Sequence, residues 1–104
     1  MTKVKITTFG EYIRTLREKS ELPLRRVAND LQMDPSLLGK IERNERPPTK
    51  DFIKQLSRFY KIDEKELTKE FLSDQIAYKI LDTNEGVQIL KVAEQKLKYL
   101  HQLS

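Results

Sequence analysis

The stretch DPSLLGKIERNERPP, from Asp34 to Pro48, combines an apolar pair, a glycine and three basic side chains immediately before two prolines. Asp34 is suited to cap a helix, and Pro35 suits the first helical position, where a missing N–H costs nothing. Leu38 and Ile41 form an inward face, while the basic side chains fall outside it. The pattern predicts a short helix with an apolar back and a polar, basic front, which the prolines end.

Apolar residues at helical spacing predict further helices on both sides of this stretch. Thr8 and Glu11 form a capping box at the start of the first one. Two more are expected at residues 73–83 and 86–103, whereas residues 3–9 (KVKITTF) are too short and isolated to pair as a strand. The expected fold is all-α, with inward positions at Phe9, Ile13, Leu16, Leu24, Val27, Ala28, Leu31, Ile53, Leu56, Tyr60, Leu67 and Phe71.

Length and composition limit the class of protein. The 104 residues suit one domain, or one small domain with an appendage, and 38% hydrophobic with 35% charged residues favours a folded chain over a disordered one. The absence of cysteine excludes disulfides, thiolate metal sites and thiol catalysis, and fits a reducing cytosol. No signal-like or membrane-spanning segment is evident, so we expect a cytoplasmic protein.

The net charge of +4 is unevenly distributed along the chain. Residues 1–62 contain fourteen Lys and Arg against eight Asp and Glu, a net +6, whereas residues 63–104 carry a net −2. A basic first part indicates a polyanionic partner for that part alone. Ordinary surface charge is the alternative explanation.

Two short helices joined by a three-residue break, the second of them basic, are typical of a helix-turn-helix. The second helix of such a motif enters the major groove of DNA. Its front here would consist of Ser36, Leu37, Gly39, Lys40 and Arg43, with the glycine allowing close approach of the backbone. Leu37 either contacts a thymine methyl group or belongs to the rim of the core.

The run LPLRRVANDLQMDPSLLGKIERNERPPT resembles the Cro and phage-repressor type of helix-turn-helix regulators, and the resemblance covers about residues 8–72. It implies a five-helix lambda-repressor-like DNA-binding domain at residues 1–72 (core 8–72), with a C-terminal helical extension at 73–104. With its tail, the whole chain also resembles, more weakly, small regulators encoded beside the DNA methyltransferases of restriction–modification systems.

The resemblance also implies roles for single residues in the reading helix, at about residues 35–44, and after it. Ser36 and Lys40 fall where relatives contact base edges. Arg43, Arg46 and Lys50 fall where relatives contact phosphates.

The resemblance also bears on three further features: one ion pair that matches the family, and two positions at which this sequence differs from it. Arg17 and Glu42 fall where relatives form a partly buried ion pair between the first and third helices. Leu24 replaces a glutamine that anchors a phosphate, so Arg25 or Arg26 is expected to compensate. Pro35 replaces a glutamine that reads a base.

The C-terminal extension carries a pattern of its own. Its apolar residues recur at spacings of three, four and three, which is typical of a helix–helix seam. We expect self-association, while packing on the protomer's own core and binding of another protein are the alternatives. The expected dimerisation residues are Ile80, Leu90, Ala93, Leu97 and Leu100.

The expected function is a sequence-specific DNA-binding transcriptional regulator that acts as a homodimer on a palindromic operator. The alternative is an antitoxin-like or adaptor protein that binds a partner through its C-terminal helices. The chain has no Ser/His/Asp set, no phosphate-cradling glycine loop and only one histidine, His101. We therefore expect no enzymatic activity, no cofactor and no metal.

Overall fold

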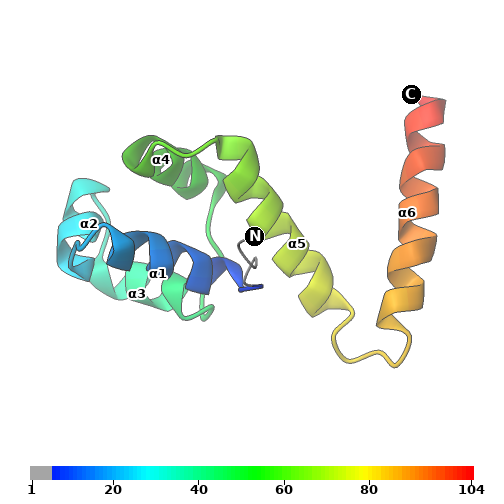
Figure 1. Cartoon of the computed structure of the whole chain (residues 1–104), viewed down its shortest axis with the longest axis horizontal. Helices are drawn as coiled ribbons and strands as arrows, with labels where there is room; N and C mark the ends of the chain where they lie inside the picture. Colours follow the sequence, from blue (N-terminus) through cyan, green and yellow to red (C-terminus); the bar gives the residue numbers. More distant parts are fainter. Residues whose placement is uncertain (1–5) are drawn as a thin grey trace, which may run out of the picture. The chain divides into compact units, whose positions relative to one another are not determined.

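The computed structural model describes residues 6–104, and these residues form six α-helices and no strand (Figure 1). This confirms the all-α class, while residues 3–5 of the stretch judged unable to pair lie outside the described range. The helices are α1 (Phe9–Lys19), α2 (Leu24–Asp30), α3 (Pro35–Glu42), α4 (Lys50–Tyr60), α5 (Glu64–Lys79) and α6 (Gly86–Leu103).

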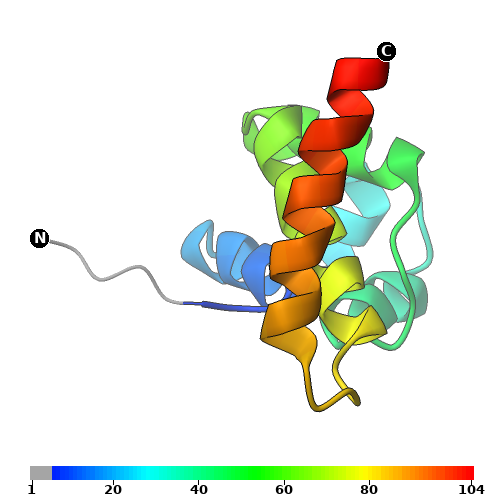
Figure 2. The same cartoon turned by 90° about the vertical axis from the view of Figure 1, so that its right-hand side faces the viewer.

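The expected separate helix at residues 73–83 is wrong, because α5 runs without a break through Ser73 to Lys79. No proline or glycine interrupts this segment, and the Ser73 hydroxyl donates to the carbonyl of Glu70 within the helix, at 3.1 Å. The chain divides within α5 into two compact units, Met1–Asp74 and Gln75–Ser104. In the second unit, Figures 1 and 2 both show α6 as one uninterrupted helix.

The core of the first unit is built from all five of its helices. Phe9 and Phe71 pack edge to face, with ring centroids 5.8 Å apart, and so join the first helix to the fifth. Most of the expected inward positions are buried, and Leu16, Leu24, Tyr60 and Phe71 are partly buried against them. The buried apolar residues are Phe9, Ile13, Val27, Ala28, Leu31, Leu38, Ile41, Phe52, Ile53, Leu56 and Leu67.

The N-terminal turn of α1 is held by side chains from three parts of the chain. Thr8 forms the expected capping box, which the structure confirms. The N–H of Gly10 donates to Oδ1 of Asn44, just after α3, at 3.0 Å, and the N–H of Phe9 donates to Oδ2 of Asp74 in α5, at 2.7 Å. The unpaired donors of the first turn are thereby satisfied, and α1 is fixed against α3 and α5.

Gly10 lets α1 approach the end of α3 more closely than any side chain would permit. A β-carbon at this position would lie 2.5 Å from the carbonyl oxygen of Glu42 and 2.7 Å from that of Ile41. Both contacts are with backbone, which cannot move aside as a flexible side chain can. The spacing between α1 and α3 therefore requires glycine here.

Arg17 and Glu42 form a two-pronged ion pair between α1 and α3. Nε and Nη2 of Arg17 donate to the two carboxylate oxygens at 2.8 and 3.0 Å, and Nη1 donates to the carbonyl of Leu22 at 3.0 Å. The two side chains are only 15% and 6% exposed. The hydrogen bonds to Glu42 raise the pKa of Arg17, and burial, with a contribution from Glu42, raises the pKa of Tyr60 to about 12.

Helices α1 to α4 all end in the same way, although no glycine is present at any of these ends. The second residue after α1, α2 and α3, and the first residue after α4, each adopt a left-handed conformation. In each case the next N–H donates back to a carbonyl five residues earlier. At the end of α2, for example, Met33 donates to Ala28 at 2.9 Å. The left-handed residues are Glu21, Gln32, Asn44 and Lys61, with φ of 56°, 55°, 62° and 56°.

Replacing Arg17 with alanine is expected to lower the free energy of unfolding by about 3 kcal/mol, because it leaves the buried Glu42 carboxylate without its partner. Arg14→Ala is the matched control on the same helix, since the Arg14–Glu18 pair is more than half exposed and should contribute below about 1 kcal/mol. Urea unfolding followed by circular dichroism measures both. Equal stability of the two variants would show that the Arg17–Glu42 pair contributes no more than a surface pair.

The two helical glycines of the first unit should respond in opposite directions to alanine. Gly10→Ala forces a β-carbon against backbone oxygens and is expected to cost at least about 2 kcal/mol. At Gly39 a β-carbon would lie 3.6 Å from Cδ2 of Leu24 and 3.1 Å from the flexible tip of Arg43. Gly39→Ala should therefore be neutral or stabilising by up to about 1 kcal/mol, through helix propensity. Thermal unfolding of both variants tests the pair, and a stable Gly10→Ala protein would contradict the close approach.

Candidate nucleic-acid interface

The helix at residues 35–42 is positioned by local capping and by its apolar back. The carboxylate of Asp34 accepts from the N–H of Ser36 at 2.8 Å, and Pro35 occupies the first turn, so both expectations for this helix start are confirmed. Leu38 and Ile41 are buried, and α3 contacts both α1 and α2. The apolar side of α3 therefore packs against the core and is not exposed to solvent.

The opposite side of α3 is polar and exposed. Ser36, Lys40 and Arg43 lie at spacings of four and three, which places them on one face of the helix and its last turn. All three side chains are exposed. The structure thus brings three of the expected DNA-contacting residues together in one row.

The other two residues expected on this face, Leu37 and Gly39, are not exposed on it, and for Leu37 this agrees with the alternative of a place at the rim of the core. Leu37 is partly buried against the core and lines a hollow of about 260 Å³ together with Arg46 and Thr49. Gly39 is buried, and a β-carbon at this position would lie 3.1 Å from Nη1 of Arg43 and 3.6 Å from Cδ2 of Leu24 at the start of α2. Gly39 therefore lies against α2 at ordinary contact distance.

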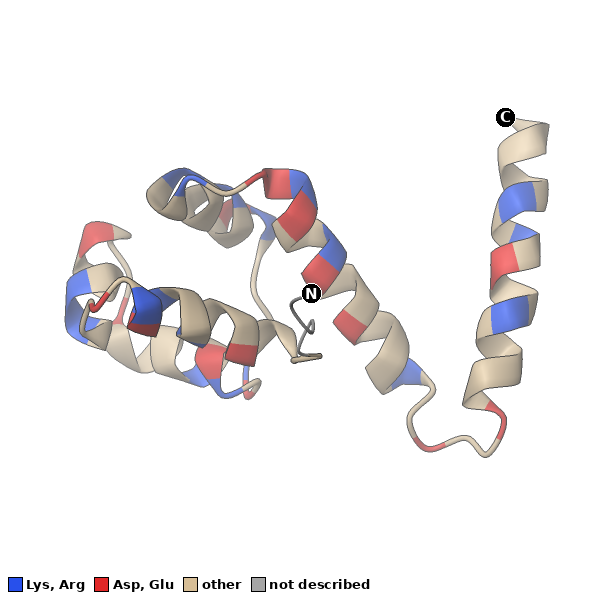
Figure 3. Ribbon diagram, in the orientation of Figure 1, with Lys and Arg blue, Asp and Glu red and all other residues tan. Residues whose placement is uncertain are grey.

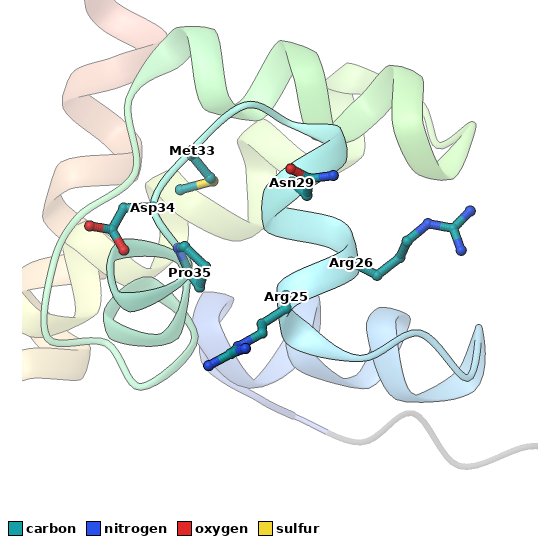
Figure 4. A pocket seen from close by; sticks show the side chains of 6 residues that line it. All are labelled: Arg25, Arg26, Asn29, Met33, Asp34 and Pro35. Carbon is teal, nitrogen blue, oxygen red and sulfur yellow. The ribbon is translucent and has the colours of Figure 1, made fainter.

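An open pocket of about 670 Å³ lies between α2 and the start of α3 (Figure 4). Arg25 and Arg26 both line it, but their side chains point in different directions. Arg26 is paired with Asp30 at 3.1 Å, whereas no ion pair of Arg25 is found among residues 6–104. Asn29, which sequence reasoning missed, also lines the pocket; its only signal was an exposed amide one turn after Arg25.

The remaining basic residues differ in how freely they could meet an anion. Arg43 is bound to Glu45 at 2.9 Å, and this hydrogen bond raises the pKa of Arg43 and lowers that of Glu45. Lys40, Arg46 and Lys50 are exposed, and within the described range they have no ion pair. Figure 3, in which Lys and Arg are coloured blue, shows basic residues on α2, at the end of α3 and on α4.

The expected dimerisation residues lie in the second unit. Leu90, Leu97 and Leu100 are 43%, 55% and 56% exposed, and Ala93 is exposed as well. Ile80 is partly buried and lies against the turn at Gly86. Within residues 6–104 no helix has both the length and the apolar character needed to cross a membrane.

Comparison with known proteins identifies the family to which the domain in the first unit belongs. No curated protein and no solved structure matches the chain significantly. A sequence model of the helix-turn-helix domain matches residues 8–69, which comprise α1 to α4 and the first part of α5. This match spans more than half of the 104 residues and includes the α2–α3 pair with its exposed basic row. The chain belongs to the helix-turn-helix domain family.

Proposed function

We propose that this protein is a sequence-specific, DNA-binding transcriptional regulator of the Cro and phage-repressor type. The helix α3 reads the major groove, while basic residues around it neutralise phosphates. In this proposal the first unit is a five-helix lambda-repressor-like domain, and the protein acts in the cytoplasm. An association with a neighbouring restriction–modification methyltransferase is a narrower hypothesis, which the genes beside it would test.

The observation that supports this proposal best is the division of α3 into two faces. Its back is fully buried, so its orientation is fixed by α1 and α2. Its front presents Ser36, Lys40 and Arg43 to solvent, with a hydroxyl and two long cations within reach of base edges and phosphates. A hydroxyl and two cations opposite a buried side suit a helix that lies in the major groove.

The proposed DNA contacts divide into two groups. Ser36 and Lys40 are assigned to base edges, with Leu37 and Gly39 at the margin of the contact. The phosphate contacts are assigned to Arg25, Arg26, Arg43, Arg46 and Lys50.

Homodimerisation on a palindromic operator completes the proposal. One reading helix contacts only a few base pairs, so a second copy on a symmetric site raises both affinity and specificity. The exposed leucines of α6 supply an apolar surface for this purpose. Leu90, Leu97 and Leu100, with Ala93, are proposed as its contact residues, and Ile80 as a residue at the base of the turn.

An antitoxin-like or adaptor function is the second candidate, and the same exposed α6 supports it. In that case the helix would bind a different protein, and the basic first unit would play a secondary role. A mobility shift on selected duplexes, compared with recovery of a stoichiometric protein partner, separates the two functions.

The first prediction for DNA binding concerns salt. If four to six phosphates are neutralised per protomer, the logarithm of the affinity for duplex DNA should fall with the logarithm of salt concentration with a slope of about −4 to −5. Arg46→Ala should reduce the magnitude of that slope by about 1. Glu45→Gln should increase the affinity, because it releases Arg43 from its ion pair. Fluorescence anisotropy over a salt series measures this, and a slope near zero for the wild-type protein would rule out the proposed interface.

The second prediction separates base contacts from phosphate contacts. On a site selected from randomised duplexes, Lys40→Ala should cost about 1–3 kcal/mol of binding free energy, and much less on unrelated DNA. Arg46→Ala should cost about the same on both, and Lys65→Ala on α5 serves as the control outside the interface. Equal losses for Lys40→Ala on both DNAs would make Lys40 a backbone contact.

A further inference from the structure

Apart from Val87 in its first turn, the exposed apolar side chains of α6 form two stripes rather than one. With 100° between successive residues, the centres of the two stripes lie about 100° apart around the helix. The first stripe, assigned above to the dimer, consists of Leu90, Ala93, Leu97 and Leu100. The second stripe consists of Ile89, Val92, Tyr99 and Leu103, which are 39%, 49%, 59% and 66% exposed.

A simple pair of α6 helices would use only the first stripe. The seam of a two-stranded coiled coil is a narrow line of positions, whereas a wide apolar face is typical of a helix that contacts more than one neighbour. The four apolar side chains of the second stripe would then remain in water, and soluble proteins rarely expose a large apolar patch. The helix therefore needs a second neighbour.

A matching apolar surface exists on α5. One face of this helix packs in the core through Leu67 and Phe71. Leu72 and Ile76, about 140° and 180° away from Leu67 around the helix, are 48% and 53% exposed. Leu72 also lines a hollow of about 290 Å³ that includes Ile53 of α4. We call Leu72 and Ile76 the outer face of α5.

We propose that, in the homodimer, the first stripe of α6 packs on the α6 of a second copy, and the second stripe packs on the outer face of that copy's α5. The inference rests on the homodimer of the proposed function and gives it a four-helix core. Each chain supplies both surfaces of the second contact, so a two-fold axis forms it twice and leaves neither surface open.

The area available supports a second copy as the occupant. A stable interface of standard size buries about 800 Å² on each partner. The exposed parts of the three leucines in the first stripe offer only roughly 300 Å², well below that requirement. The second stripe and the outer face of α5 add about twice as much again, which brings the total into the range of a standard interface.

Lys96 provides an independent reason to expect a specific partner. It lies within the second stripe, between the Ile89–Val92 half and the Tyr99–Leu103 half, and its charge separates them. A single lysine in an apolar seam fixes register and oligomeric state at a cost in stability, while its aliphatic stem still packs. Lys91, in contrast, lies on the polar side of α6.

Sedimentation velocity of the full chain over a dilution series tests the proposal. Val92→Glu and Ile76→Glu should each raise the dimer dissociation constant at least about tenfold, as Leu97→Glu should, because each places a charge in the interface. Gln95→Glu on the polar side of α6 is the matched control and should leave the dimer dissociation constant unchanged. Lys96→Leu should tighten association, whereas Lys91→Leu should not.

The outcomes distinguish the two levels of the proposal. If only Leu97→Glu weakens the dimer, and Val92→Glu and Ile76→Glu do not, the second contact is overturned while the proposal of a homodimer stands. A wild-type chain that is monomeric at every concentration would overturn the homodimer as well, and the affinity for a single half-site would still report on the DNA-binding function. Circular dichroism identifies any variant that fails to fold. If a glutamate variant is unfolded, the comparison of Lys96→Leu with Lys91→Leu tests the second contact instead. Equal dimer dissociation constants for these two variants would contradict the proposal.

Discussion

The packing of α1 on α3 is the constraint on which the rest of the first unit depends. Glu42 is the one buried charged residue in the part of the chain that the structure describes, and Arg17 neutralises it from the neighbouring helix. Gly10, at the opposite end of α1 from Arg17, brings the backbone of α1 against the carbonyls of Ile41 and Glu42. Because both ends are fixed, the rotation of α3 about its axis is fixed, and with it the direction of its exposed basic row.

The turns between the helices carry a conformational cost that glycine would have avoided. A residue such as Gln32 in a left-handed conformation is strained by contact between its β-carbon and the backbone. The turn offsets this through two backbone hydrogen bonds at the end of α2 and through Met33, which packs on the core. The angle between α2 and α3 therefore results from local hydrogen bonding and core packing together.

The helices α5 and α6 show why apolar spacing alone is ambiguous. Leu67 and Leu72 belong to the same helix and are both apolar, yet one is buried and the other is half exposed. Apolar spacing predicted a separate helix after Leu72, and the family resemblance implied that a five-helix core would be complete there. Asp74 shows that the core continues beyond that point, since its carboxylate caps α1.

The sequence by itself determined the helical class, the caps at Thr8 and Asp34 and the inward positions Leu38 and Ile41. These features depend on residues no more than four apart, so spacing along the chain contains the information. Only the tertiary structure decided that Gly39 faces α2 and that Asp74 bonds to Phe9, sixty-five residues away. Such contacts depend on how complete helices pack against one another, and no local pattern in the chain specifies that distance or angle.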